Sequence, residues 1–519
     1  MGLACAWSIA LSGLDGRVVE VEVDIGAGLP RTVLVGLPDA SLYESRDRCK
    51  AALSNSGLRW PDRLVTINLS PATLPKAGSH YDLAITAAVL AANGILPAHE
   101  LRRTIFLGEL GLDGRVRPVR GILPAVLAGQ QYGFERAVVP YAQAAEATLV
   151  DGMEIIGVAS LPQLVALCTG TEVPDCTPVP WVGAPRQPGT RHDLADVVGQ
   201  AEAKWSLEVA AAGGHHLQLS GPPGVGKTML AERLPGLLPA LRPAEALEVA
   251  AVHSLAGLPL PDGLDLVPPY ADPHHTASLV SIVGGGSRWP RPGAISCAHR
   301  GVLFLDEAPE FGPKVLEALR TPLESGVVVI GRSDVQARFP ARFQLVLAAN
   351  PCPCGQVLSP GSLCRCTPMT VRRYAEKISG PIRDRIDVTQ TFVPMRKAFL
   401  RHELARGESS SVVAGRVREA RDRAHRRLEG SGWRNNGEVP GPYLRRYLPL
   451  PDGLEVLERA VDRGLLSPRG VDRCLRVAWS VADLAGFDVP GREHVRAALA
   501  LRRGEAVHDS GEPRARDAG

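Results

Sequence analysis

The chain has 519 residues, which is too many for a single hydrophobic core and predicts roughly two to four domains. Hydrophobic residues make up 45% of it, as in ordinary globular proteins, and a formal net charge of +3 gives no overall electrostatic case for nucleic acid binding, so any basic surface must be local. No apolar run reaches the roughly 18 residues of a membrane-spanning helix, and no export signal is recognisable, so we expect a cytoplasmic protein that does not use a membrane.

The first 170 residues are predicted to form one α+β domain. The clearest strand-like and helical runs lie at residues 18–23, 32–35, 64–69 and 81–92. The apolar opening is predicted to be a strand that ends in a turn at Asp15 and Gly16. Residues 171–191 are rich in proline and polar residues, which predicts a linker.

Two further regions follow the linker. Strands alternate with helices over residues 192–394, which predicts an α/β domain around a parallel sheet. The pattern is almost wholly helical over residues 395–504. The polar residues 505–519 are predicted to be a disordered tail.

A complete phosphate-loop motif, GPPGVGKT, occupies residues 221–228. It follows a strand-like run and opens the helical stretch TMLAERLPGLL, the context that G-x-x-x-x-G-K-[ST] requires. Its glycines let backbone N–H groups cradle phosphates, while Lys227 reaches the β- and γ-phosphates and Thr228 holds Mg²⁺. The predicted ATP-binding residues are Gly221, Pro222, Pro223, Gly224, Val225, Gly226, Lys227 and Thr228.

Two adjacent carboxylates end the next buried strand pattern, in GVLFLDEAPEF at residues 301–311. Open α/β sheets place their ligands at the carboxyl ends of their strands. Asp306 is therefore predicted to join the Mg²⁺ shell, and Glu307 to orient and polarise the attacking water.

A third strand pattern, at residues 345–349, ends at Asn350. This side chain is predicted to position water against the γ-phosphate. A cap of the strand end is the alternative.

In their order along the chain, the motifs VVGQ, GPPGVGKT, LFLDE, LVLAAN and GPIRDRID resemble those of AAA+ ATPases. More narrowly, PHHTAS, RPGAISCAHRGVLFLDEAPEF and AANPCPCG are similar to the magnesium-chelatase-like group known as the YifB/ComM family. The resemblance covers essentially the whole chain except the linker and the tail. It implies an AAA+ core with a helical lid, ATP and Mg²⁺ as cofactors, and Val198 and Gly199 beside the nucleotide.

Two arginines receive roles from this resemblance alone. GPIRDRID looks like the segment that carries the arginine finger, with Arg385 as the better match and Arg383 as its rival. LSPRG is similar to the sensor-2 start of the lid, which nominates Arg469. A finger supplied in trans needs a neighbouring subunit, and the resemblance implies a homo-hexameric ring.

Four of the ten cysteines lie in CPCGQVLSPGSLCRC, directly after Asn350. Its prolines and glycines favour a loop. Four thiolates gathered by such a loop predict a tetrahedral zinc site formed by Cys352, Cys354, Cys364 and Cys366. The C-x-C spacing is tighter than usual for zinc, and reduced thiols or a redox-sensitive pair are the alternatives.

The N-terminal region resembles the domain of Lon proteases, which implies an S5 domain 2-like α+β fold. In LPKAGSHYD, His80 occupies the place of the nucleophilic serine and Ser79 precedes it. In GELGLDGRVRPVRGILPAV, Leu123 occupies the place of the lysine. Because a Ser–Lys dyad needs both groups, we expect a domain without protease activity. Lys76 and Arg120 are read as solvated loop charges, with phosphate or partner contact as the alternative.

Two arginine-bearing segments are candidate DNA contacts, since arginine with an interleaved aromatic residue suits a single strand. The first, SIVGGGSRWPRPG, carries Arg288 and Arg291; the second, IGRSDVQARFPARF, carries Arg332 and Arg338. Hairpins packed against neighbouring subunits are the alternative. The arginine-rich helix over residues 413–428 is read as a solvated face, with a phosphate-binding face as the alternative.

These observations predict an ATP-hydrolysing motor. The resemblance implies a ring that acts as a DNA helicase or branch-migration factor in recombination or natural transformation. The alternatives are a motor subunit of magnesium-chelatase type and an ATP-dependent protein remodelling factor without protease activity.

Overall fold

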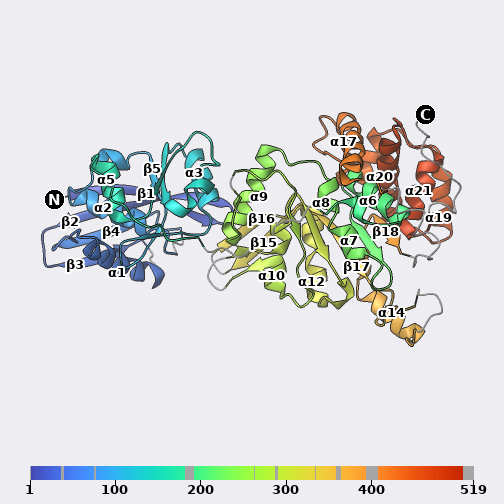
Figure 1. The fold of residues 1–519 in the computed structure, drawn as a ribbon, viewed down its shortest axis with the longest axis horizontal. Coiled ribbons are helices and arrows are strands. Elements are labelled where there is room, and N and C mark those ends of the chain that lie inside the picture. Colours follow the sequence, from blue (N-terminus) through green and yellow to red (C-terminus); the bar gives the residue numbers. More distant parts are fainter. Residues whose placement is uncertain are drawn as a thin grey trace.

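The computed structural model describes residues 2–36, 40–74, 78–181, 192–261, 263–286, 290–332, 335–357, 364–392 and 407–506. The chain forms an elongated molecule, with N-terminal elements at one end, the C-terminal helices at the other and a second sheet between them (Figure 1). Among the described residues, no helix combines the length and apolar character needed to cross a membrane. The predicted linker at residues 171–191 lies partly outside these residues, as does the predicted tail.

A seven-stranded sheet forms the N-terminal region, in the order β3-β4-β2-β1-β5-β8-β9. Its strands are β1 (Gly2–Ser12), β2 (Asp15–Gly26), β3 (Arg31–Val35), β4 (Leu64–Ser70), β5 (Thr104–Phe106), β8 (Arg136–Pro140) and β9 (Glu154–Val158). Helices cover both faces of this sheet, because successive side chains of a strand point to opposite faces. Ala6 and Ala10 of β1 pack with α1 (Ala40–Asn55) and α2 (Asp82–Ala92), whereas Ile9 packs with α3 (Ile122–Gln131).

The predicted turn at Asp15 and Gly16 is wrong by two residues. Ser12 pairs with Asp15, so the turn consists of Gly13 and Leu14, and Asp15 already belongs to β2. Gly13 has φ +67°, a left-handed conformation that glycine adopts without strain. The sequence pattern located the hairpin but not the residue that reverses the chain.

A five-stranded parallel sheet forms the central region, in the order β11-β14-β17-β10-β18. Its strands are β11 (Tyr270–Ala271), β14 (Val302–Leu305), β17 (Gln344–Ala349), β10 (Leu217–Ser220) and β18 (Val388–Thr391). All residues of β14 and β17 are buried, which explains their continuous apolar sequence.

The helix expected after the phosphate loop is interrupted. It forms as α7 (Lys227–Ala231) and α8 (Leu234–Leu237). Pro235 lies in the first turn of α8. Proline has no N–H to continue a helix and fits only its beginning, so a new helix starts there.

The C-terminal region consists of packed helices. They are α17 (Ser410–Arg427), α18 (Gly441–Tyr447), α19 (Leu454–Asp462), α20 (Pro468–Ala485) and α21 (Arg492–Arg503). They share one hydrophobic cluster with β10 and with α6 (Ala201–Gly213), so this region is continuous with the central core.

The arginines of α17 form the predicted solvated face only in part: Arg418 and Arg426 are exposed, whereas others pair with neighbouring helices. Arg416 pairs with Glu208 of α6, with Nε 2.6 Å from Oε1, and Arg421 donates to the carbonyl of Ala211 at 2.6 Å. Arg427 pairs with the buried Asp483 of α20. These arginines hold the C-terminal helices on the central domain.

The N-terminal and central regions meet at α9 (Pro243–Ala256). Ala250 and Ala251 of α9 belong to the same cluster as α3. The N–H of Gly121 donates to the carbonyl of Ser254 at 3.2 Å, and that of Leu123 to its hydroxyl at 3.3 Å. The shared apolar cluster makes this junction a packed interface.

Candidate active site

The topology of the central sheet brings the three predicted strand ends together. β17 lies between β10 and β14, and all three run parallel. Their carboxyl ends therefore meet at one edge of the sheet, with the phosphate loop, Asn350 and the acidic pair at adjacent positions.

The phosphate loop turns into α7 at Gly226, which has φ +90°. The Lys227 side chain is 8% exposed. Its Nζ donates to the carbonyl oxygens of Gly221 at 2.7 Å and Pro222 at 2.9 Å, and to Oδ1 of Asn350 at 3.0 Å. Burial lowers the pKa of Lys227, and Asp306 and Glu307 oppose that shift. The ammonium thus lies between the loop and the end of β17.

The two predicted Mg²⁺ ligands are in direct contact. The Thr228 hydroxyl donates to Oδ2 of Asp306 at 2.7 Å, across 78 residues of sequence. The other carboxylate oxygen, Oδ1, accepts the backbone N–H of Glu307 at 2.8 Å. A hydroxyl beside a carboxylate is an oxygen donor set that suits Mg²⁺, so these residues fit that ion.

Glu307 has φ +50°, an uncommon conformation for a residue with a side chain. Such conformations cluster at functional sites, where the surrounding structure imposes them. Its carboxylate is partly exposed, and Oε2 lies 3.5 Å from Nδ1 of His275. An exposed carboxylate beside the Thr228–Asp306 pair is placed to orient a water molecule.

Two contacts were not singled out from the sequence. His275, within PHHTAS, lies four residues after the end of β11, and the Gln200 side chain of VVGQ donates to the carbonyl of Val225 in the phosphate loop. Beside Gln200, Gly199 is buried with φ +67° and Val198 is half-buried. Only the adjacency of β11 and β14 joins His275 to Glu307, and spacing in the sequence gives no sign of it.

The arginine candidates lie in different settings. Arg385 is 7% exposed, pairs with Glu324 of its own chain and donates to the carbonyl of Pro381. Arg383 is exposed. Arg469 is exposed in the first turn of α20.

Side chains from two C-terminal helices form hydrogen bonds with the backbone around Arg385. Arg473 of α20 donates to the carbonyl of Arg385 at 2.9 Å and pairs with the buried Asp387. Arg502 of α21 donates to the carbonyl of Ile386. The position of this segment therefore depends on α20 and α21.

The four cysteines form one cluster. The Sγ atom of Cys352 lies 3.3 Å from that of Cys354 and 3.8 Å from that of Cys364, and the Sγ atoms of Cys354 and Cys364 are 3.6 Å apart. All four Sγ atoms, including that of Cys366, lie within 4.8 Å of one another. Zn–S bonds of about 2.3 Å in a tetrahedron place sulfur atoms about 3.8 Å apart, so the set fits zinc.

The thiol of Cys354 is adapted to carry charge. Its pKa falls to about 6, first because the backbone N–H of Gln356 donates to it and then because the Cys352 thiol does. The thiolate is the form that binds metals.

The protease-like site lacks the groups of a dyad. Ser79 donates to the carboxylate of Glu109, and Leu123 is fully buried against α9. Nε2 of His80 is buried without a hydrogen-bond partner in the described part of the chain, and burial lowers the pKa of His80 to about 4. The hydroxyl of Ser79 is thus engaged by a carboxylate.

The DNA-contact candidates occupy the central region near the N-terminal one. Arg291 is exposed on the short strand β13 (Arg291–Pro292), and Arg332 ends β15 (Val327–Arg332). Arg338 is exposed on β16 (Val335–Pro340), where its backbone bridges to Gly13. Arg288 and Lys76 lie outside the described residues, and Arg120 donates to the carbonyl of Ala256 at 3.4 Å.

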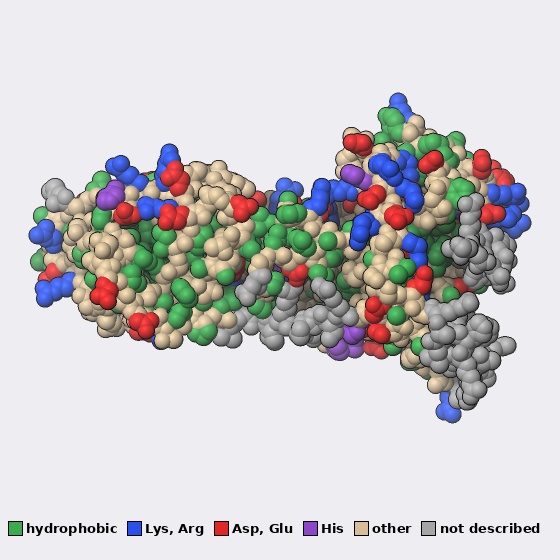
Figure 2. All heavy atoms as spheres, turned by 45° about the horizontal axis from the view of Figure 1, so that its top comes forward, with side chains coloured by type: hydrophobic (Ala, Val, Ile, Leu, Met, Phe, Trp, Pro, Cys, Tyr) green, Lys and Arg blue, Asp and Glu red, His purple; other side chains and the backbone are tan. Residues whose placement is uncertain are grey.

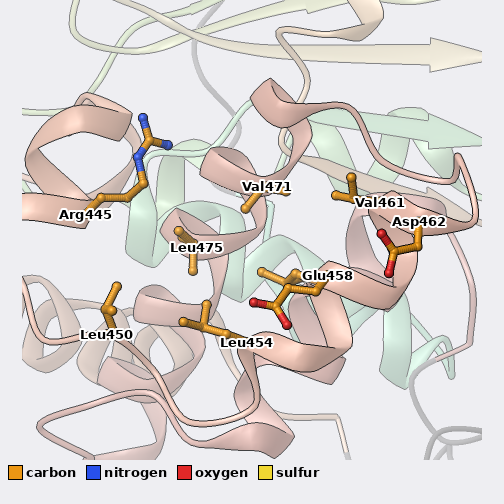
Figure 3. Close-up of a pocket in the computed structure, with 9 residues that line it drawn as sticks. Arg445, Leu450, Leu454, Glu458, Val461, Asp462, Val471 and Leu475 are labelled. Atoms are coloured by element: carbon orange, nitrogen blue, oxygen red, sulfur yellow. The ribbon is translucent and has the colours of Figure 1, made fainter.

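A pocket of about 300 Å³ lies among α18, α19 and α20 (Figure 3). Apolar side chains line much of it, among them Leu454, Val471 and Leu475, and Arg445 and Glu458 also belong to the lining. The phosphate loop contributes nothing to its lining. We therefore assign this pocket no part in nucleotide binding.

Three family models match the chain. They are magnesium chelatase, subunit ChlI, over residues 193–399; subunit ChlI of Mg-chelatase, over residues 21–143; and the C-terminal part of magnesium chelatase, subunit ChlI, over residues 407–502. The three matches together span all three regions of the fold.

Similar proteins match over nearly their whole length. An uncharacterized protein of Mycobacterium tuberculosis is 54% identical over 97% of this chain and 99% of its own. The uncharacterized protein YifB of Escherichia coli is 40% identical over 97% of each chain, and competence protein ComM of Haemophilus influenzae is 40% identical over 97% of this chain and 98% of its own.

A partial match also exists: Lon protease 2 of Bacillus subtilis is 26% identical over 29% of this chain and 30% of its own.

Proposed function

Because the chain belongs to the YifB/ComM-like group of the magnesium-chelatase family of AAA+-type ATPases, we propose that it works as an ATP-driven ring motor on DNA. The observation that carries the ATPase part is the hydrogen bond between Thr228 and Asp306, next to that between Lys227 and Asn350. Four residues from three strand ends thereby surround one point at the edge of the sheet.

Each side chain has a role in hydrolysis. Backbone N–H groups of the phosphate loop and the Lys227 ammonium bind the phosphates, and Thr228 and Asp306 hold Mg²⁺. Mg²⁺, when bound, neutralises charge on the β- and γ-phosphates. Glu307 orients water and accepts its proton, and Asn350 positions that water against the γ-phosphate.

In this proposal the active form is a homo-hexamer. The arginine finger, Arg385, acts on the γ-phosphate bound by a neighbouring subunit, so its pair with Glu324 opens when the ring forms. Arg469 approaches the nucleotide from the C-terminal helices.

The DNA contacts are local in this proposal. Lys and Arg side chains are interspersed with Asp and Glu over the face seen in Figure 2. Arg291 and Arg338 are exposed on segments that carry no other assigned task, which supports them as phosphate contacts. One full-length relative is named a competence protein, which agrees with a role on DNA.

The decisive experiment measures ATP hydrolysis with and without single-stranded, duplex and branched DNA over a salt series. We expect stimulation by DNA that weakens as salt rises, because phosphate contacts release counterions. An ATPase that no DNA stimulates, together with salt-insensitive binding, would overturn the DNA part and leave the ATPase. A second arm with a porphyrin and Mg²⁺ tests the magnesium-chelatase alternative, which the family models favour by name.

The four-cysteine cluster holds zinc in this proposal. The sulfur–sulfur distances support it. Metal analysis of protein purified without added metal should give about one zinc per chain. Four free thiols and no metal would leave the cluster as reduced cysteines.

A further inference from the structure

The segment from Asn350 to Gly355 touches the phosphate loop at both of its ends. At its start, Oδ1 of Asn350 accepts a hydrogen bond from Nζ of Lys227 at 3.0 Å. At its other end, Gly355 lies against the ring of Pro223, since a Cβ added to Gly355 would be 2.5 Å from Cδ of that proline. Cys352 and Cys354 lie between these two contacts.

The shape of this segment depends on a tight turn. The N–H of Gly355 donates to the carbonyl of Cys352 at 2.9 Å, and Gly355 has φ +75°. The Sγ atoms of Cys352 and Cys354 are 3.3 Å apart. Cys352 is buried, but Cys354 and Gln356 are exposed. The turn therefore has little support from apolar packing.

The other two cysteines connect the cluster to the acidic segment. Cys366 is followed directly by Thr367, whose hydroxyl caps α14 (Pro368–Glu376) by accepting the N–H of Thr370 at 3.2 Å. Just beyond α14, Lys377 pairs with Glu310 at 3.2 Å, three residues after Glu307. The cluster therefore lies between the segment that contacts the phosphate loop and the helix that is followed by the Lys377–Glu310 pair.

We infer that a zinc ion on the four cysteines holds the segment beside the phosphate loop in the position that binds nucleotide, so that loss of the metal weakens ATP binding. The ion ties the Asn350–Gly355 segment to Cys364 and Cys366, and thereby fixes Gly355 against Pro223 and Asn350 against Lys227 of the phosphate loop. Metal binding supplies folding energy where apolar contacts are few, and displacements of about 1 Å at a binding site are costly. This inference rests on the proposed ATP and zinc sites and is independent of DNA.

The test measures the Kd of a fluorescent ATP analogue in the full-length protein, with excess Mg²⁺ throughout. Zinc is removed with a chelator that spares Mg²⁺, and Cys364→Ser removes one ligand without touching the phosphate loop. We expect the Kd to rise about tenfold in both cases, and zinc added back to the chelated protein to restore it. Cys176→Ser is the matched control, because Cys176 lies outside the cluster and its thiol donates to the carbonyl of the neighbouring Thr177.

An unchanged Kd after verified zinc removal would overturn the inference that zinc supports ATP binding, while leaving both proposed sites intact. Protein that contains no zinc as purified overturns it as well. A Kd that rises on chelation but does not recover when zinc returns points to general unfolding and also counts against it. Failure of DNA to stimulate hydrolysis would bear on the proposed motor and not on this contact.

Discussion

At the scale of single residues, the proposed mechanism assigns nucleotide binding and hydrolysis to different groups. Lys227 and Thr228 belong to the phosphate loop, whereas Glu307 is partly exposed and contacts the Asp306 side chain only through its backbone. Removing the Glu307 carboxylate should therefore affect hydrolysis and spare binding.

Glu307→Gln should lower kcat by about 10²–10⁴-fold, the usual contribution of a general base, and leave the Kd for ATP unchanged. Single-turnover hydrolysis and equilibrium binding measure the two quantities. Glu310→Gln is the control, since Glu310 pairs with Lys377 on the surface three residues away. Normal turnover in the Glu307 variant would remove this residue from its role.

Arg385→Ala should lower kcat by about 10³-fold, as expected when an arginine finger is lost, with little change in ATP affinity. Its partner Glu324 remains largely exposed, so the variant leaves no buried carboxylate unpaired. Arg383→Ala is the control, and steady-state kinetics at ring-forming concentrations is the measurement. A stronger effect of the Arg383 change would transfer the role to the rival.

At the scale of elements, a buried ion pair joins the C-terminal helices to the central sheet. Asp387, just before β18, is 2% exposed and pairs with Arg473 of α20. Burial acts to raise the pKa of Asp387, but Arg473 and then His215 outweigh it and hold the pKa well below its usual range. The stabilisation from this pair is therefore present at neutral pH and is lost as the pH falls through the lowered pKa.

Asp387→Asn should destabilise the protein by about 3–5 kcal/mol, because it leaves the Arg473 charge without its partner. Denaturant unfolding at pH 7 measures the change, and the difference from the parent should shrink in acid. Asp488→Asn, on an exposed loop of the same region, should have no effect. Equal stability of the Asp387 variant and the parent would show that the Asp387–Arg473 ion pair does not stabilise the fold.

For the elements, pattern and structure agree where a segment is buried throughout. The apolar run at 302–305 is β14, and the run at 345–349 forms β17 with one more residue. They differ where local detail decides, as at the turn of Gly13 and at Pro235, where a single proline divides an expected helix. The arginine-rich helix is polar in sequence, yet its partners are Glu208 and Asp483 of other helices, which no periodicity can indicate.

At the scale of the whole molecule, the N-terminal region is packed onto the central region by a shared core. Leu123, at the place of the protease's lysine, lies in the cluster that includes Ala250 and Ala251. The position of the protease's lysine is thereby part of a domain junction, which agrees with a supporting role for this region.

Ala251→Asp should disturb both regions at once, since it buries a charge at this junction. Each kcal/mol lost should lower the thermal midpoint by about 2–4 °C for regions of this size. Differential scanning calorimetry is the measurement, with limited proteolysis to detect release of the N-terminal region. Ala145→Asp, at an exposed position, is the control, and an equal midpoint in both variants would contradict a shared core.

The sequence by itself determined the family, the phosphate loop and the order of the strand-end residues, because each of those signals is contained in a few consecutive residues. Only the tertiary structure decided which of them meet: His275 with Glu307, Gln200 with Val225, and Gly355 with Pro223. These contacts join segments far apart along the chain, and strand order and close packing fix them rather than any local preference.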